Sequence, residues 1–441
     1  MMKPMIITRP ARSLSTLRKL CAQTKKELEV KDYTGEHHKR AKRVYLWGNA
    51  RTGALGVPKF LEPEKPDRSP VFTQSKPYNF HWPVRASFKV KHVAAGYGFT
   101  VYAGRSRDRS LVMVGCGINT DSQIGYHSDK GSPVDYVITP QFFELPISEE
   151  DGAVCTSVAC GRAHTVIATN KAVFTLGNNV FGQCGRTVVE GEKYGGSRVI
   201  HTVERDDIIK AVCGYDHTLL LSADGSVYSC GLGTDGQTGL GNFECASTFT
   251  KLQGALTGKK IVDIDCKCDT VLAVSDEGEV FGWGNSEYGQ FDIVTQDPQI
   301  NTPTHLPISS ICGKVEKVAA AATNCAIVND RGEVYVWGYG VLGKGPELQQ
   351  SVEPELIPMT LFGMNTFSQD IRVEKVFSGV NCFAAVTNTK ALYTWGKNAH
   401  GCLGLGHKNV QYFPFMVSVG SEVNDVACGA DHVVTLCRSF V

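Results

Sequence analysis

The stretch VWGYGVLGKGP, residues 336–346, has glycine and lysine spacings that are typical of phosphate binding. Gly338, Gly340 and Gly343 form a G-x-G-x-x-G pattern, and Gly338, Gly343 and Lys344 match most of a phosphate-binding loop. Both patterns require a helix whose first N–H groups hold the phosphate. No helical pattern follows here, and Gly345 stands where such a loop needs the Ser or Thr that ligates magnesium. We therefore predict that these glycines form turns and that the stretch binds no nucleotide cofactor.

Three histidines could also take part in catalysis or metal binding, because imidazole transfers protons and binds zinc. They are His164, His217 and His432, in the segments CGRAH, CGYDH and CGADH. Asp216 and Asp431 precede two of them, but neighbours on a strand face opposite sides, so no catalytic Asp–His pair is implied. Zinc ligands must converge on one point, whereas these histidines lie in separate repeats. We predict core histidines, no metal site and no bond-making enzymatic activity.

The histidines belong to a repeat of the form apolar-Ala-Cys-Gly-x-x-His-Thr that occurs seven times. The clearest copies are VACGRAHTVIAT (158–169), AVCGYDHTLLLS (211–222) and VACGADHVVTL (426–436). The positions equivalent to its glycine are Gly96, Gly161, Gly214, Lys267, Ala321, Gly379 and Gly429. The cysteine before the glycine suits a small core position, and we expect the sixteen cysteines of the chain to be thiols.

A second repeat, apolar-x-Trp-Gly followed by a Gly-rich turn, also occurs seven times. Its anchoring glycines are Gly48, Gly115, Gly177, Gly231, Gly284, Gly338 and Gly396. A period of about 53 residues with about four strands per unit predicts an all-β, seven-bladed β-propeller. The chain opens with a Trp-Gly unit at Gly48 and ends with a Cys-Gly unit at Gly429. Strands from both chain ends should therefore complete one blade and leave no exposed sheet edge.

The N-terminal arm differs in composition from the rest of the chain. Seven Lys and Arg and no acid occur up to Lys26, with Leu14, Leu17 and Cys21 at helical spacing, as in a mitochondrial transit peptide. The alternative is nuclear import, because Lys25-Lys26 and residues 39–43, KRAKR, resemble a bipartite signal. We expect residues 1–43 to be a transit peptide with a basic linker.

The remainder of the chain, residues 44–441, is mildly acidic, with 33 basic against 40 acidic residues. A protein that coats DNA non-specifically would present a basic body. No apolar run approaches the roughly 20 residues that span a bilayer, so any membrane association should be peripheral.

Together the two motifs resemble those of the regulator of chromosome condensation family, whose fold is a seven-bladed propeller. The resemblance covers residues 44–441, with both motifs repeated in phase. Finer features, such as GALGVP (53–58), GNNVFGQCGR (177–186) and FGWGNSEY (281–288), are similar to mitochondrial members of the family.

The resemblance implies two kinds of function. Founding members are guanine-nucleotide exchange factors for a small nuclear GTPase and are held on chromatin. Mitochondrial members are associated with large-subunit ribosomal RNA, pseudouridylation and mitoribosome biogenesis, and with nucleotide exchange on a mitochondrial fusion GTPase. The founding exchange mechanism uses an inserted β-wedge, and we assign no such insertion from the sequence.

Basic residues in the Gly-rich turns are the remaining candidates for binding. Arg51, Arg186, Lys344 and Lys397 occupy these turns in four repeats and are expected on one rim, where they would meet RNA phosphate or a partner. Our preferred hypothesis is a mitochondrial matrix scaffold, with a possible inner-membrane association, that binds ribosomal RNA or RNA-modifying proteins. The alternatives are an exchange factor for a mitochondrial GTPase and a nuclear family member.

Overall fold

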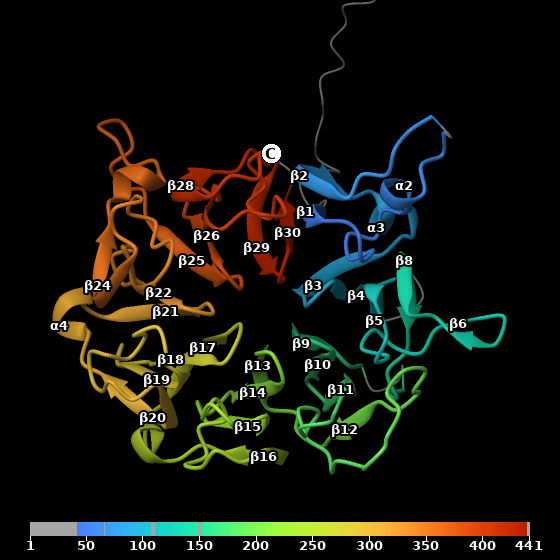
Figure 1. Cartoon of the computed structure of the whole chain (residues 1–441), viewed down its shortest axis with the longest axis horizontal. Coiled ribbons are helices and arrows are strands. Elements are labelled where there is room, and N and C mark those ends of the chain that lie inside the picture. Colours follow the sequence, from blue (N-terminus) through green and yellow to red (C-terminus); the bar gives the residue numbers. More distant parts are fainter. Residues whose placement is uncertain (1–41, 66, 107–110, 149–151, 439–441) are drawn as a thin grey trace, which may run out of the picture. The chain divides into compact units, whose positions relative to one another are not determined.

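The computed structural model describes residues 42–438, apart from residue 66 and segments 107–110 and 149–151. Seven four-stranded antiparallel sheets surround a central axis (Figure 1). The predicted all-β, seven-bladed propeller is therefore confirmed. Residues 1–41, on which most of the expected transit peptide falls, lie outside the described residues, so that assignment stays a prediction.

The strands of each blade follow one another outward from the axis. The first blade holds β29 (Glu422–Cys428), β30 (His432–Arg438), β1 (Lys42–Asn49) and β2 (Thr73–Asn79). The second holds β3 (Lys89–Ala95), β4 (Phe99–Arg105), β5 (Val112–Ile118) and β8 (Tyr136–Phe143). The third holds β9 (Cys155–Cys160), β10 (His164–Thr169), β11 (Val173–Gly177) and β12 (His201–Val203). The fourth holds β13 (Ile208–Cys213), β14 (His217–Ser222), β15 (Val227–Gly231) and β16 (Ala246–Lys251).

The other three blades repeat this plan. The fifth holds β17 (Ile261–Cys266), β18 (Thr270–Ser275), β19 (Val280–Asn285) and β20 (Gln299–Leu306). The sixth holds β21 (Val315–Ala320), β22 (Asn324–Asn329), β23 (Val334–Tyr339) and β24 (Gln350–Ile357). The seventh holds β25 (Val373–Ser378), β26 (Cys382–Thr387), β27 (Leu392–Gly396) and β28 (Gln411–Met416).

A few short elements connect or extend the blades. The helices are α2 (Pro58–Leu61), α3 (Trp82–Arg85) and α4 (Ser309–Cys312), with 3-10 turns η3 (Gly254–Leu256) and η4 (Met359–Phe362). The strands β6 (Ser128–Asp129) and β7 (Ser132–Pro133) form a separate two-stranded ribbon.

Burial is high in the second strand of each blade and low in the outermost strand. Every residue of β10, β14, β18, β22 and β26, the second strands of five blades, is buried. These strands read as nearly continuous apolar runs because neighbouring blades cover both of their faces. The outermost strands, such as β16 and β28, are largely exposed or half-buried.

The two ends of the propeller domain meet in the first blade. β1 pairs with β30 over seven consecutive residue pairs, from Lys42 opposite Arg438 to Gly48 opposite His432. β29 and β2 complete this sheet. The predicted closure by strands from both ends is therefore confirmed, and the ring has no open edge at its seam.

Candidate functional site

The motif histidines lie at the start of the second strand of their blades and are fully buried. Nε2 of His164 lies 3.0 Å from Oγ1 of Thr218 in the next blade, and Nε2 of His432 lies 2.8 Å from Oγ1 of Thr100. Each threonine hydroxyl donates its proton to a backbone carbonyl, so the imidazole must donate to the threonine. The His-Thr part of the motif thus forms hydrogen bonds between blades.

The glycine three residues before each histidine makes room for the imidazole. A Cβ on Gly161 would lie 2.2 Å from Cε1 of His164, closer than real Cβ contacts allow. The same overlap would occur between Gly214 and His217 and between Gly429 and His432. Copies without glycine have no ring at the histidine position: they pair Lys267 with Thr270 and Ala321 with Asn324. Glycine and histidine therefore act together as one packing unit.

His217 has a different environment from the other two histidines. Neither of its ring nitrogens has a hydrogen-bond partner within the described chain, and Nδ1 lies 3.8 Å from a carboxylate oxygen of Asp269. Burial lowers the pKa of His217 and of His164 to about 3, so both rings are neutral at pH 7. Burial, with the Asp235 carboxylate adding to it, raises the pKa of Asp269 to about 7.

The aspartates beside the histidines are held by other groups. Asp216 forms an ion pair with Arg162. Asp431 accepts a hydrogen bond of 2.6 Å from Nδ2 of Asn49, and its Oδ1 lies 3.4 Å from Nδ1 of His432. The expectation that Asp431 and His432 face opposite sides is therefore wrong, because Asp431 lies in the bend before β30, where strand alternation does not apply.

The tryptophans of the second motif also connect neighbouring blades. Three of the four indole N–H groups donate to a backbone carbonyl in the Gly-rich turn of the preceding blade. The pairs are Trp337 with Gln290 (2.7 Å), Trp283 with Gln237 (3.1 Å) and Trp47 with Cys402 (2.7 Å). Trp395 is equally buried, but its Nε1 has no hydrogen-bond partner among the described residues.

The anchoring glycines of the second motif adopt positive φ, where other residues are strained. The values are 113° at Gly48, 93° at Gly284, 96° at Gly338 and 122° at Gly396. In the second blade the equivalent residue is Gly117, with φ of 109°, and not Gly115 as the sequence repeat suggested. Gly117 pairs with Phe99 as Gly177 pairs with His164. Two glycines stand close together there, and only the strand register distinguishes them.

The stretch with the phosphate-binding pattern lies at the end of β23 and in the turn that follows. Residues 340–349, all of them described, form turns and irregular chain up to β24. A Cβ on Gly343 would lie 2.9 Å from Nε1 of Trp395, so this glycine is needed for packing between the sixth and seventh blades. Nζ of Lys344 lies 2.5 Å from a carboxylate oxygen of Glu355.

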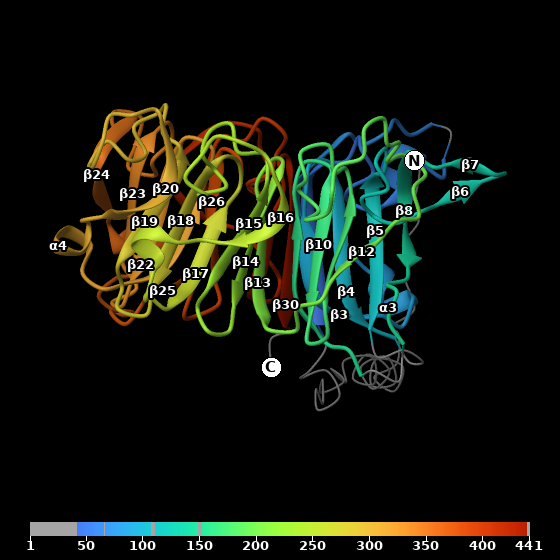
Figure 2. The same cartoon turned by 90° about the horizontal axis from the view of Figure 1, so that it is seen from below.

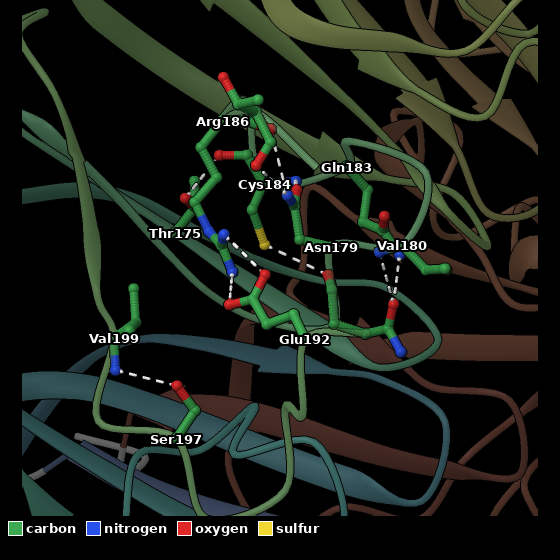
Figure 3. A network of polar contacts seen from close by, with 11 residues as sticks. Thr175, Asn179, Val180, Gln183, Cys184, Arg186, Glu192, Ser197 and Val199 are labelled. Atoms are coloured by element: carbon green, nitrogen blue, oxygen red, sulfur yellow. Dashed lines mark hydrogen bonds and ion pairs between the residues drawn. The ribbon is translucent and has the colours of Figure 1, made fainter. Parts of the chain in front are cut away.

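The four predicted binding cations lie in the Gly-rich turns of four different blades. Figure 3 shows the guanidinium of Arg186 facing the carboxylate of Glu192, with two hydrogen bonds of 2.9 and 2.6 Å. With Lys344 paired as well, two of the four charges are already neutralised. Arg51, which lies 5.0 Å over the ring of Phe72, and Lys397 are exposed. The role of the four in binding RNA or a partner stays a prediction.

A charged cavity of about 350 Å³ lies along the axis of the propeller. A β-bulge in the innermost strand of each blade places one equivalent residue there; six of these line the cavity: Ser157, Lys210, Asp263, Lys317, Lys375 and Asp425. Burial raises the pKa of Asp425, and Nζ of Lys210 lies 2.7 Å from Asp263. Lys267 also lines this cavity, and its Nζ donates to the carbonyl of Ala95 at 3.0 Å.

Sequence reasoning missed this ring of charges. The signal was available, because the residue four positions before each motif glycine recurs with the same period, as in Lys375 before Gly379 and Lys210 before Gly214. Charged residues at the innermost strand of a propeller can face only the axis or a neighbouring blade.

The ribbon β6–β7 was missed as well. It projects from the second blade beyond the edge of the propeller (Figures 1 and 2). Its turn uses Lys130 at φ 48° and Gly131 at φ 84°, and the guanidinium of Arg198, from the third blade, lies 4.4 Å over the ring of Tyr126 at the base of the ribbon. The ribbon lies between Gly115 and Gly161, in a chain in which the sequence pattern indicated no inserted β-wedge.

The residues that the structure describes include neither a candidate metal cluster nor a membrane-spanning helix. No group of three or more His, Cys, Asp or Glu side chains there is arranged to hold a metal ion. In that part of the chain no helix is long and apolar enough to cross a membrane. The fifteen cysteines that the structure describes are free thiols, and fourteen of them are buried or partly buried.

Comparisons with known proteins agree with this architecture. The RCC1-like domain matches residues 173–439. The chain is 44% identical to the mouse RCC1-like G exchanging factor-like protein over 97% of this chain and 94% of the relative, and 44% identical to the human protein over 94% and 91%. The crystal structure of human WBSCR16 has a TM-score of 0.85 at 44% identity and covers 91% of this chain and 100% of that chain.

More distant structures show the fold alone. Yeast RCC1 (Prp20), solved bound to Kap60, has a TM-score of 0.71 at 16% identity, over 92% of this chain and 91% of that chain. The resemblance inferred from the repeated motifs is therefore confirmed. The chain belongs to the RCC1-like propeller family.

Proposed function

We propose that this protein is a mitochondrial binding scaffold in large-subunit ribosomal RNA maturation, including pseudouridylation, and in mitoribosome assembly. One observation carries the scaffold part. Two of the three motif histidines and three of the four motif tryptophans form hydrogen bonds between blades, as in His164 to Thr218 and Trp337 to Gln290. The surface loops are then the part of the molecule that is available to bind partners. The transit-like arm and the likeness to mitochondrial family members support the location and the pathway.

The ion pairs on the rim favour contact with RNA-modifying proteins over direct contact with RNA phosphate. Arg186 and Lys344 already have carboxylate partners, and an RNA would have to displace these before it gained their charge. Arg51 and Lys397 are too few to give strong phosphate binding, which commonly uses about six to ten contacts.

Ultraviolet cross-linking in purified mitochondria, with an import-competent tagged chain, tests the proposal. The tagged chain should recover large-subunit ribosomal RNA or proteins that modify it, above an untagged control. The variant Arg51→Glu/Lys397→Glu should reduce any direct RNA cross-link. Lys171→Glu/Lys314→Glu, which changes two exposed lysines at the opposite ends of the strands, is the matched control. Recovery at the level of the untagged chain would refute the scaffold function.

A second candidate, guanine-nucleotide exchange on a mitochondrial GTPase, is favoured by the projecting ribbon β6–β7. A short projecting ribbon is the kind of element that can enter a partner's nucleotide site, and the related mouse and human proteins are named G exchanging factor-like. Release of a fluorescent GDP analogue from purified mitochondrial GTPases would measure this activity. A variant in which residues 128–133 are replaced by a short glycine turn should lose it; no acceleration by the intact chain would eliminate this candidate.

A further inference from the structure

A surface cavity of about 290 Å³ lies between the fifth and sixth blades. The turn after β19 supplies Glu287, Tyr288 and Asp292, and the sixth blade supplies Tyr339, the last residue of β23, and Gln350, the first of β24. Pockets for drug-sized ligands start at about 300 Å³, so this cavity is suited to one side chain more than to a nucleotide.

Two exposed tyrosines form the aromatic part of the cavity. Their rings are stacked, with centroids 5.9 Å apart and planes inclined by 22°. Tyr288 is 43% and Tyr339 is 45% exposed, although both have large apolar rings. At the position of Tyr339 other repeats carry Asn49, Asn178, Asn285 or Lys397, so the blade fold does not require an aromatic residue there. The pair therefore has no evident role in holding the propeller together.

The charge of the cavity decides which ligand it suits. Glu287 and Asp292 both line it, and its lining contains no Lys, Arg or His. Within the described ranges neither carboxylate has a basic side chain at ion-pair distance. A nucleotide or an RNA segment could stack on the tyrosines, but its phosphates would be repelled by the two carboxylates. A cation gains both from the carboxylates and from the faces of the rings.

We propose that this cavity binds an arginine side chain of a partner protein. The planar guanidinium stacks on the tyrosine rings while its N–H groups donate to the carboxylate of Glu287 or Asp292. Lysine fits less well, because its ammonium group is more strongly hydrated and cannot stack. The inference goes beyond the scaffold function and does not depend on it, since it concerns only the chemistry of one cavity.

The experiment uses the purified full chain and two fluorescently labelled peptides, tetra-arginine and tetra-citrulline. Citrulline has nearly the shape of arginine without its charge. We expect tetra-arginine to bind and tetra-citrulline not to bind, in fluorescence anisotropy at low salt. Tyr288→Ala/Tyr339→Ala should weaken tetra-arginine binding by about tenfold, as expected for two cation–π contacts.

Further variants separate this cavity from general attraction to an acidic surface. Tyr288→Phe/Tyr339→Phe keeps the ring faces and should retain binding, whereas Glu287→Gln/Asp292→Asn should lose about as much as the alanine pair. Glu204→Gln/Asp206→Asn removes two exposed acids from a loop between blades three and four and should change little. Circular dichroism melts confirm that each variant is folded.

Three results would overturn the inference. The first is binding of tetra-citrulline as tight as that of tetra-arginine. The second is a loss of binding in Glu204→Gln/Asp206→Asn as large as that in Glu287→Gln/Asp292→Asn. The third is tyrosine-dependent binding of an oligouridine in place of the peptide. Because only purified protein is used, failure here leaves the ribosomal RNA proposal intact, and failure of the mitochondrial cross-linking leaves this cavity assignment intact.

Discussion

The indole N–H groups of Trp337 and Trp395 provide a matched test of how the second motif stabilises the ring. Both side chains are almost completely buried, and they occupy equivalent positions in adjacent blades. Nε1 of Trp337 donates to the carbonyl of Gln290 at 2.7 Å, whereas Nε1 of Trp395 has no partner among the described residues. Replacing each with Phe removes the same atoms, so the loss of apolar contact is similar in the two variants.

The polar contributions should then have opposite signs. Trp337→Phe leaves the buried carbonyl of Gln290 without its donor, which costs about 1–3 kcal/mol, whereas Trp395→Phe removes a buried N–H that was already unpaired. We expect Trp337→Phe to lower the free energy of unfolding by at least about 2 kcal/mol more than Trp395→Phe does. Urea unfolding followed by circular dichroism, with equal denaturant slopes, measures this difference. Equal losses, or a larger loss for Trp395→Phe, would refute the assignment of these bonds.

Two further predictions concern the first motif and pH. Gly161→Ala should lower the free energy of unfolding by about 1–3 kcal/mol, because the new Cβ overlaps His164. The loss should be smaller in a His164→Asn background, which reproduces the natural pair Ala321 and Asn324. A double-mutant cycle measured by urea unfolding tests this coupling. The pKa of Asp269 is raised to about 7, so the folded state binds this proton more tightly than the unfolded state and loses stability as pH rises from about 4 to 7. As pH rises through this window, Asp269→Asn should therefore gain up to about 4 kcal/mol of stability relative to the parent chain. Melting temperatures of the variant and the parent chain that change in parallel with pH would contradict this.

Much of the fold could be predicted because the determinants are local and periodic. Strand alternation, glycine turns and the order of the two motifs fix the number of blades and the closure of β1 on β30. The pairing of Gly161 with His164 is also a local signal, since they lie three positions apart and the two copies without glycine, at Lys267 and Ala321, also lack a ring at the histidine position.

The surface sites were less predictable, because they depend on which loops approach one another. Sequence placed Arg186 and Lys344 on one rim, but it could not show that Glu192 and Glu355 neutralise them. Tyr288 and Tyr339 are 51 residues apart in numbering, and only the packing of the fifth blade on the sixth stacks their rings.

The sequence by itself determined the seven-bladed ring, its seam and its family, because a repeated pattern of buried strands has one way to cover both faces of every blade. Tertiary structure alone decided that Gly117 and not Gly115 anchors the second blade and that the ribbon β6–β7 projects. These features follow from strand register and from contacts between distant segments, and no local pattern of residue types specifies either.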